Sequence, residues 1–491
     1  MQLHNVRYGF ATNSSSSHSV ILAPGLTDKE APDELGYGWE KFILASEEEK
    51  RRYLFTAAVL SLRGHDATPA QRAKVAYQVR EGFPVSDRDV DIAIDGGECE
   101  YTSMYIDHQS MVGFPRPRRE EDGMTPLWKF LDREIAQQSK IVIAGGNDNC
   151  DNEAWKPHAA KHAPRLALWK DLTESASHFL FDEKTGHLTI FNGTNGKKVR
   201  IIPDNAPAPK FAAVPELVDV KITDYCPVGC TYCYQGSTKK GKHGDLAEIQ
   251  AFARRIGAMG VFEVAIGGGD PTTHPHFPEI LKAFHDNGVV PNFSTQLWDW
   301  FDDERIVDAV KRYCGAVALS TQNVTQAEKF FKECKKHNIR AHIHYVLGLK
   351  PLSNLQKMLK LKVRDYYGQH LVLLAYKEMG RATGTPPVDY TGWQQTVRDN
   401  NDYRWSIAVD SFLVDDVRAG FSREEVPAEL FESSDGRFSL YWDAVDGSFA
   451  AHSFKPQNER LHYGPGSSEK IQEAWKTISK QAGRLPVLYE E

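Results

Sequence analysis

The residues after position 215 predict an α/β fold built on a parallel sheet. Short runs rich in β-branched residues recur there, and most are followed by a stretch with the apolar spacing of an amphipathic helix. Repeated strand–helix units of this kind favour parallel strands, because a parallel crossover needs a connection about as long as a helix. The spacing alone is compatible with a barrel and with an open doubly wound sheet.

Each element of this region can be assigned from its pattern. We expect strands at 217–223, 262–267, 289–294, 316–321, 340–347 and 370–376. We expect helices at 246–259, 277–287, 305–313 and 325–337. Loops that follow parallel strands meet at one edge of the sheet, where such folds collect ligands.

The segment 203–216, PDNAPAPKFAAVPE, predicts a linker because prolines alternate with alanine and the hydrophobic periodicity lapses. It separates an expected amino-terminal α+β domain, 1–205, from the strand–helix region, 215–425. We expect residues 426–491 to form a short carboxy-terminal extension.

Composition excludes some classes of protein. The 491 residues carry a formal net charge of -7, which argues against strong non-specific binding of nucleic acid. The first residues lack the pattern of a signal peptide, and no run reaches the roughly 20 apolar residues of a membrane span. Seven cysteines in a chain of this length fit a reducing compartment, so we expect a cytoplasmic protein with no membrane segment.

The stretch ITDYCPVGCTYCYQ contains Cys226, Cys230 and Cys233 directly after the first expected strand. Thiolates at this density are ligands for iron–sulfur clusters or zinc, and three of them leave one iron of a four-iron cluster without a protein ligand. Structural zinc takes four ligands, usually as two separated pairs, although His243 could be a fourth. A zinc-stabilised binding protein therefore stays open as the non-enzymatic alternative.

The spacing C-x3-C-x2-C, with Tyr232 just before the last cysteine, resembles the radical SAM superfamily. The resemblance implies a partial (β/α)6 TIM-like barrel and one 4Fe-4S cluster on the three cysteines. It also implies that S-adenosyl-L-methionine chelates the fourth iron and is cleaved reductively to a 5'-deoxyadenosyl radical, which abstracts hydrogen from a substrate. Tyr232 would pack near the adenine, and a low-potential donor such as flavodoxin or ferredoxin would supply the electron.

The second expected strand ends in Gly267, Gly268, Gly269 and Asp270. Consecutive glycines let a backbone approach a ligand closely, and the segment looks like the family's GGE-type contact to the methionine amino group. Here aspartate replaces the commoner glutamate.

Further cofactor contacts are expected at later strand ends, where hydroxyl and amide groups can bond a ribose or a carboxylate. These residues are Ser294, Ser320 and Gln322. Lys377 and Arg381 lie in a segment similar to the family's YKxxGR pattern, and either could bind the carboxylate of S-adenosylmethionine or an anionic substrate group. Local backbone capping and solvated loop charge are the simpler interpretations.

Two more features have open interpretations. His342 and His344 point to the same face of the fifth expected strand, either into the barrel or against its helices. The loop GSTKKGKHGD after Cys233 forms a local positive patch, which could attract phosphate or be solvated.

The ends of the chain limit the chemistry. Residues 438–454 resemble the two-stranded segment of SPASM extensions but contain no cysteine, so we expect a single cluster. In the amino-terminal region, Asp107, His108, Asp148 and Asn149 are ligand types for a metal, but a role in shaping the entrance or binding substrate is preferred. The expected substrate is a peptide, with a nucleotide or nucleic-acid base as the alternative.

Overall fold

The computed structural model describes residues 2–8, 42–63, 69–84, 106, 114–119, 123–138, 143–145, 177–203, 206–207, 209–362, 370–401, 405–422 and 435–483. The chain divides into two compact units, one comprising Met1–Arg7 and Asn13–Ala208, the other Tyr8–Thr12 and Pro209–Glu491. The division after Ala208 falls inside the expected linker, and residues 435–483 belong to the second unit. The three-domain division remains a prediction.

The first unit combines a sheet with helices. Its main sheet has the order β1-β7-β6-β5-β3, and β2 pairs with β4. The strands are β1 (Gln2–Tyr8), β2 (Phe42–Leu44), β3 (Arg116–Pro117), β4 (Ile143–Gly145), β5 (Ser177–Asp182), β6 (His187–Asn192) and β7 (Lys197–Ile202). The helices are α1 (Glu47–Arg63), α2 (Pro69–Gly82) and α4 (Thr125–Leu131), which continues into the π-helical turn η2 (Asp132–Ala136).

One apolar core joins these elements. Trp128 of α4 is fully buried and packs edge-on against Phe114 and at a tilt against Phe83, while strand residues such as Ile190 belong to the same cluster. Several residues singled out in the sequence lie outside the described residues of this unit. They are Asp107, His108, Asp148 and Asn149.

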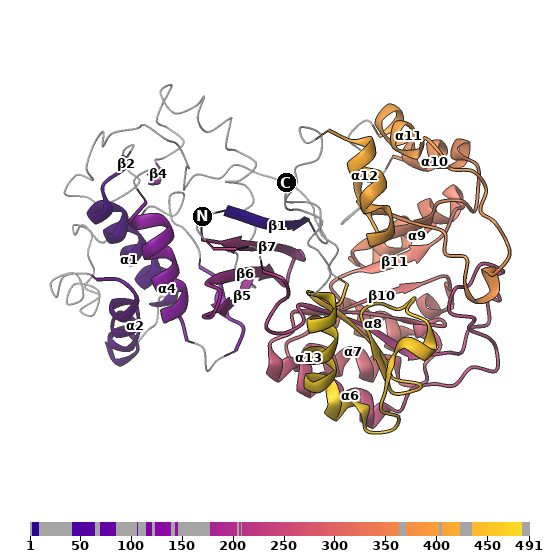
Figure 1. Cartoon of the computed structure of the whole chain (residues 1–491), viewed down its shortest axis with the longest axis horizontal. Helices are drawn as coiled ribbons and strands as arrows, with labels where there is room; N and C mark the ends of the chain where they lie inside the picture. Colours follow the sequence, from indigo (N-terminus) through magenta and orange to yellow (C-terminus); the bar gives the residue numbers. More distant parts are fainter. Residues whose placement is uncertain are drawn as a thin grey trace. The chain divides into compact units, whose positions relative to one another are not determined.

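The second unit contains the strand–helix series (Figure 1). Its sheet has the order β14-β13-β12-β11-β10-β9-β8-β15-β16-β17. The first six strands in chain order are β8 (Leu217–Thr223), β9 (Glu263–Gly268), β10 (Val290–Thr295), β11 (Val317–Ser320), β12 (Ala341–Val346) and β13 (His370–Leu374). They pair in parallel and in sequence order, as in a TIM-like barrel. The predicted α/β fold with a parallel sheet is confirmed.

The predicted helices are also confirmed, and no bound differs by more than one residue. They are α6 (Leu246–Met259), α7 (Phe277–Asp286), α8 (Glu304–Tyr313) and α9 (Val324–Lys336). Local chemistry explains the start of α6, because the Asp245 side chain accepts the N–H of Glu248 at 2.9 Å and caps the first turn. In the described part of the second unit, four further helices were not predicted: α10 (Leu352–Leu359), α11 (Trp393–Asn400), α12 (Val414–Gly420) and α13 (Ile471–Ala482).

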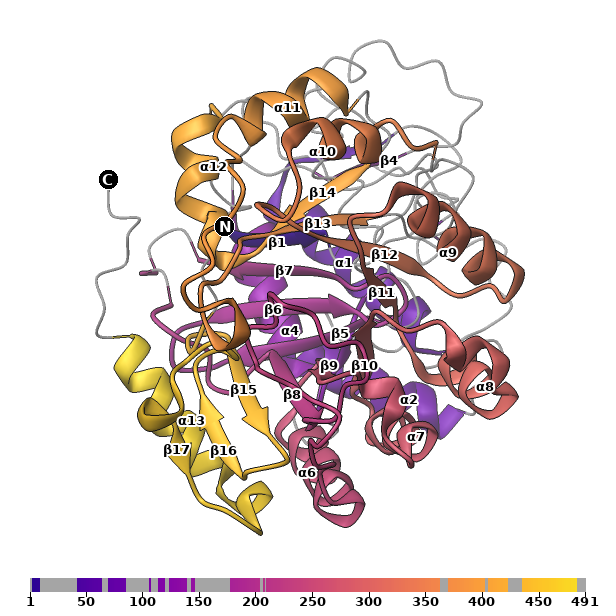
Figure 2. The same cartoon turned by 90° about the vertical axis from the view of Figure 1, so that its right-hand side faces the viewer.

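Strands near the carboxyl end extend the sheet at both edges. β14 (Ser406–Val409) pairs in parallel with β13, and β15 (Ser439–Asp443) pairs in parallel with β8. β16 (Ser448–Ala450) and β17 (Leu461–His462) continue the sheet from β15 as antiparallel strands, on the side of β15 away from β8 (Figure 2). The two-stranded segment expected at 438–454 is therefore present, and it is part of the same sheet. Among the described strands, no pairing joins β14 to β17.

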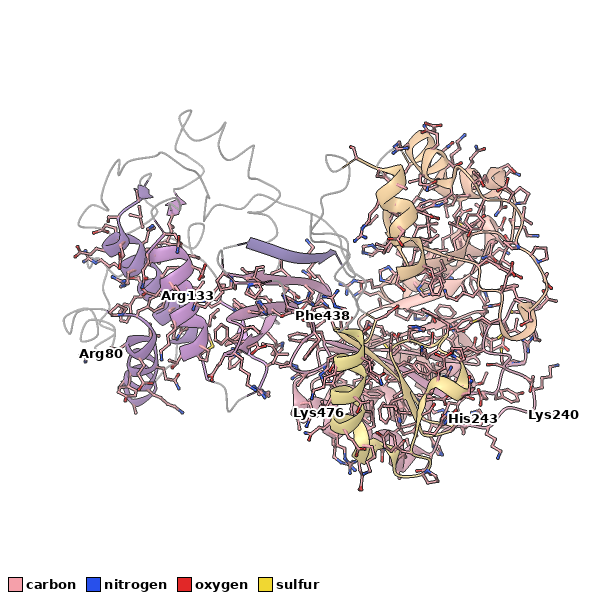
Figure 3. All side chains as sticks on the ribbon, in the orientation of Figure 1. Arg80, Arg133, Lys240, His243, Phe438 and Lys476 are labelled. Atoms are coloured by element: carbon pink, nitrogen blue, oxygen red, sulfur yellow. The ribbon has the colours of Figure 1, made fainter. Side chains whose placement is uncertain are left out.

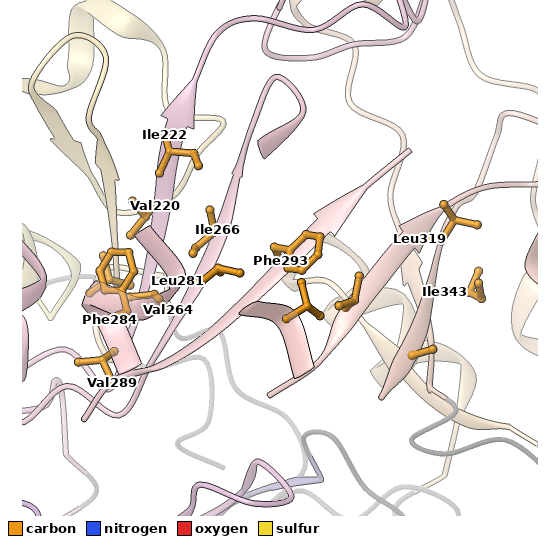
Figure 4. Packing of buried hydrophobic residues seen from close by; sticks show 14 of the residues in the cluster. Val220, Ile222, Val264, Ile266, Leu281, Phe284, Val289, Phe293, Leu319 and Ile343 are labelled. Atoms are coloured by element: carbon orange, nitrogen blue, oxygen red, sulfur yellow. The ribbon is translucent and has the colours of Figure 1, made fainter. Parts of the chain in front are cut away.

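The two faces of this sheet differ in polarity. One face carries Ile266, Phe293 and Leu319, which belong to the same buried cluster as Leu281 and Phe284 of α7 (Figure 4). Side chains alternate along a strand, so the intervening residues lie on the opposite face. These include Asp219, Glu263, Asn292, Ser294, Ser320, His342, His344 and His370.

The histidines of β12 thus lie on the polar face, opposite the helix-packed side. His342 is buried, and its ring lies 4.7 Å from that of His370 on the neighbouring strand. Burial, together with the charge of Lys377, lowers the pKa of His344 to about 4, so this imidazole is neutral near pH 7.

In the described residues, no helix has the length and apolar character needed to cross a bilayer.

Candidate active site

The three cysteines lie in the connection between β8 and α6. The N–H of Cys226 donates to the carbonyl of Thr238 at 3.0 Å, and the N–H of Asp224 donates to the carbonyl of Lys242 at 2.8 Å. These hydrogen bonds therefore tie the first residues of the connection to residues nearer its end. Cys226, Cys230 and Cys233 are free thiols, and each is half-buried. We call residues 224–238 the cysteine loop.

Two groups in this loop have raised pKa values. Burial is the main cause of the raised pKa of the Cys226 thiol, and nearby Asp270 and Cys230 add to it. Burial and the neighbouring Cys230 raise the pKa of Tyr232 to about 12, so its hydroxyl stays protonated. Tyr232 is therefore placed beside the cysteines, and its contact with a cofactor remains a prediction.

The glycines after β9 pack against the cysteine loop. The N–H of Gly269 donates to the carbonyl of Thr223 at 2.6 Å, and a Cβ on Gly269 would lie 2.0 Å from the carbonyl oxygen of Tyr225. Gly268 has φ +128°, which L side chains rarely adopt. A Cβ on Gly267, in contrast, would meet nothing within 4 Å. Gly268 and Gly269 thus support the loop, while Gly267 borders open space.

Asp270 is buried and fully occupied by protein donors. Its Oδ1 accepts from the N–H and hydroxyl of Thr272 at 3.2 and 2.7 Å. Its Oδ2 accepts from the Thr295 hydroxyl at 2.7 Å and from the N–H of Gln296 at 3.0 Å. This carboxylate joins the ends of β9 and β10, and its contact with S-adenosylmethionine remains a prediction.

Gln296 is the residue near the cysteines that the sequence interpretation missed. The Cys230 thiol donates to Oε1 of Gln296 at 3.1 Å. The expected contact in this segment was Ser294, which lies half-buried on the polar face of β10. Gln296 stands just beyond the strand end, where a polar side chain in an α/β fold is a usable signal.

The other strand-end residues lie further along the sheet. Ser320 ends β11 and pairs in register with His344 of β12. Gln322 follows β11, and its carbonyl accepts from the Asn354 side chain at 2.8 Å. Both are half-buried. Their assignment as cofactor contacts remains a prediction.

Lys377 and Arg381 are brought to the cysteine loop but are not free in this structure. The ammonium of Lys377 lies 2.7 Å from Oδ2 of Asp410, and it also lies over the rings of Tyr234, Phe412 and Phe454 at 5.8, 5.1 and 5.2 Å. The guanidinium of Arg381 donates to backbone carbonyls of the loop. Anion binding by either residue remains a prediction.

The three cysteines and His243 do not come together as one group of metal ligands in the described part of the chain. Among the described residues, no three side chains of His, Cys, Asp or Glu form a group that could hold one metal ion. His243, the possible fourth ligand, lies with Nδ1 at 2.9 Å from the Thr223 hydroxyl and packs against Tyr225 and His274. A four-iron cluster, in contrast, takes one thiolate on each of three irons.

Residues 220–346 match the family described as the Radical SAM superfamily. This match includes the three cysteines and the strands β9 to β12. Residues 220–346 are therefore a radical SAM domain. Superfamily members use a 4Fe-4S cluster and S-adenosylmethionine. The predicted superfamily and its cofactors are thus confirmed for this domain. The match defines no subfamily.

Curated relatives match over short segments. PqqA peptide cyclase of Ruegeria pomeroyi is 32% identical over 78 residues, which are 15% of this chain and 21% of the relative. GTP 3',8-cyclase of Edwardsiella ictaluri is 29% identical over 85 residues, which are 16% of this chain and 26% of the relative. The chain thus matches only about a quarter or less of either relative's length.

Solved structures resemble the chain more broadly but at low identity. SuiB of Streptococcus suis bound to S-adenosylmethionine is 12% identical, with a TM-score of 0.47 over 62% of this chain and 87% of that chain. The structure of anSMEcpe with bound AdoMet is 15% identical, with a TM-score of 0.41 over 55% of this chain and 84% of that chain.

Proposed function

We propose that this protein is a radical SAM enzyme that modifies a peptide. The observation that carries the proposal is the position of three free cysteines on one loop after the first strand of a radical SAM domain. When bound, the cluster would supply the electron that cleaves S-adenosylmethionine to a 5'-deoxyadenosyl radical.

The residues present fit such a cluster. Cys226, Cys230 and Cys233 form no disulfide. The Nη2 atom of Arg381 is buried with no hydrogen-bond partner among the described residues, although its other groups bond the cysteine loop. A buried guanidinium N–H without an acceptor is costly, so this corner of the loop is suited to an anionic sulfur group.

The chain's own residues have three tasks in this reaction. The cysteines hold the cluster, and the support described for Asp270, Gln296 and Arg381 keeps them in place. The polar face of the sheet, with Ser320 and the neutral His344, provides hydrogen-bonding groups for a bound substrate. The partial burial of Ser320 and His344 limits water near a reactive radical.

Both substrate classes have support among the relatives. A peptide is favoured by the PqqA peptide cyclase, the first of the curated relatives. The alternative is a nucleotide, which the GTP 3',8-cyclases favour. The lysine patch at 239–242 is exposed, and it would suit an anionic substrate of either class, peptide or nucleotide.

Anaerobic reconstitution tests the chemistry. We expect about four irons and four sulfides per chain, and 5'-deoxyadenosine that forms only when a reductant such as dithionite is present. Cys230→Ala should lose cleavage, whereas Cys314→Ala, at the end of α8, should keep it. One tightly bound zinc with no cleavage by the wild type would contradict the proposal.

A substrate screen separates the two classes. If the substrate is a peptide, a short precursor peptide encoded beside this gene should increase 5'-deoxyadenosine formation and gain a mass change of its own. GTP should then have no effect. Stimulation by GTP, with a modified nucleotide as product, would support the alternative.

A further inference from the structure

The segment after β13 is bound directly to the cysteine loop. The N–H of Arg381 donates to the carbonyl of Cys233 at 3.0 Å, and its Nε–H donates to the carbonyl of Cys230 at 2.8 Å. Its Nη1 donates to the carbonyl of Ser237. One residue, 151 positions away from Cys230 in the sequence, therefore satisfies three carbonyls of the loop.

Gly380 makes this approach possible. Its φ of +61° lies in the left-handed region. A Cβ at this position would lie 2.5 Å from the carbonyl oxygen of Cys233 and 2.4 Å from that of Tyr234, which real Cβ atoms do not tolerate. Gly380 and Arg381 belong to one 3-10 turn, η5 (Gly380–Ala382), so the glycine sets the distance at which the arginine reaches the loop.

The chemistry of arginine suits this task. A guanidinium is a rigid planar fork of donors, so its two side-chain bonds to the loop restrict both carbonyls relative to each other. The cysteine loop contains little regular structure, and its backbone carbonyls need partners wherever they are buried. Holding the carbonyls of Cys230 and Cys233 also holds the two thiols, which is the preorganisation that a metal site requires.

We propose that Arg381 is a positioning residue for the cluster, and this inference rests on the proposed function. It holds Cys230 and Cys233 in place before the cluster assembles, and its remaining Nη2–H groups gain an acceptor when the cluster is bound. A positive charge at this place stabilises the reduced, more negative cluster, so it raises the reduction potential.

The test separates the geometry from the charge. Arg381→Gln removes the charge and most of the fork, while Arg381→Lys keeps the charge as a point donor. Gly380→Ala leaves Arg381 intact but prevents the close approach. Arg312→Gln is the matched control, because Arg312 is exposed on α8 and pairs only with Asp308 in the described part of the chain.

The first readout is amide hydrogen exchange of residues 226–238 in metal-free protein. Arg381→Gln and Gly380→Ala should accelerate exchange roughly tenfold or more, since each loses at least one charge-assisted or close-packed contact. Both should also bind less than half of the wild-type iron after reconstitution. Arg312→Gln should change neither quantity.

The second readout is the reduction potential of the reconstituted cluster, followed by electron paramagnetic resonance. We expect a lower potential in Arg381→Gln and a potential close to wild type in Arg381→Lys. Unchanged exchange, iron content and potential in Arg381→Gln would overturn the proposal. If that variant does not fold, Gly380→Ala decides the matter by the same exchange measurement.

The failure of this inference is distinguishable from the failure of the proposed function. Exchange in metal-free protein does not depend on cleavage of S-adenosylmethionine. Faster loop exchange in the variants, with no cleavage by the wild type, would retain the positioning role and remove the enzymatic one. Normal cleavage by the wild type, with unchanged loop exchange in the variants, would retain the enzymatic role and remove the positioning role.

Discussion

The thiol of Cys230 lies 3.1 Å from Oε1 of Gln296, and the backbone N–H of Gln296 is held by Oδ2 of the buried Asp270. A continuous set of hydrogen bonds therefore joins the ends of β9 and β10 to the cysteine loop. Since Asp270 also accepts from Thr272 and Thr295, one carboxylate joins the turn after β9 to the end of β10 at the expected cofactor edge.

Asp270→Ala should destabilise the fold by about 3 kcal/mol, because it leaves several buried donors without an acceptor. Asp270→Asn should have a smaller effect, since one carbonyl oxygen remains. Urea titration of the metal-free protein measures both changes. Asp308→Ala, which removes an exposed pair with Arg312, is the control and should leave the midpoint nearly unchanged.

Gln296→Leu should change the cluster more than the fold. The substitution removes the polar partner of Cys230 but keeps the backbone bond to Asp270, so we expect little change in the urea midpoint. The reduction potential of the reconstituted cluster should fall, because a cluster-bound thiolate has no proton to donate and Gln296 would instead donate its Nε2–H to the sulfur. Hydrogen bonds to the sulfurs stabilise the reduced state. Gln395→Leu, on the exposed face of α11, should leave the potential unaltered. Equal potentials in both variants would show that Gln296 has no such role.

Trp442→Ala should lower the free energy of unfolding by about 3–5 kcal/mol, the usual range for truncating a buried large aromatic side chain. Trp442 of β15 is fully buried, stacks on Phe252 of α6 at 3.8 Å, and donates to the Ser467 hydroxyl at 3.0 Å. Trp442→Phe keeps the stacking on Phe252 and should lose much less stability than the alanine variant. A loss below about 1 kcal/mol in the alanine variant would mean that β15 contributes little to the second unit.

Stability should fall as pH rises from about 4 to about 7, because of Asp219. Burial raises the pKa of this carboxyl to about 7, with smaller contributions from Asp435 and Glu263. An unfolded aspartate ionises near pH ~3.9, so in this window the folded protein retains a proton that the unfolded chain has lost.

Asp219→Asn tests this dependence, since it keeps the shape and removes the titration. The variant should match the wild type near pH 4 and exceed it by a few kcal/mol at pH 8, as measured by urea titration. Asp415→Asn, a substitution of an exposed side chain on α12, should show the wild-type profile. An Asp219→Asn profile parallel to the wild type would exclude a raised pKa at this position.

An acidic electron donor should use the lysines beside the cysteine loop. Lys239, Lys240 and Lys242 are exposed, and Lys240 extends from the second unit (Figure 3). Lys240→Glu with Lys242→Glu should slow 5'-deoxyadenosine formation driven by reduced flavodoxin roughly tenfold at low salt. The rate with dithionite should not change.

The control for this experiment is Lys476→Glu with Lys480→Glu on α13, which gives the same net charge away from the loop. It should retain the wild-type rate with flavodoxin. Equal slowing in both double variants would indicate a general charge effect, and the lysine patch would then have no special role.

Much of the second unit could be predicted because its information is local. The apolar spacing of 246–259 corresponds to α6, and the run at 217–223 corresponds to β8. Periodicity and caps act over a few residues, so they are visible in one dimension. The strands that pair at the edges of the sheet could not be predicted from the sequence. The pairing of β15 with β8, for example, joins residues more than 200 positions apart.

The sequence by itself determined the chemistry of the site: three thiols with cluster spacing, placed after the first strand of a parallel α/β series. Only the tertiary structure decided which residues surround them. Asp270, Gln296 and Arg381 meet at the cysteine loop because parallel strands bring their carboxyl ends to one edge, and long-range packing sets those distances. Residue types carry reactivity locally, whereas contacts such as the one between Arg381 and Cys230 exist only when distant segments fold together.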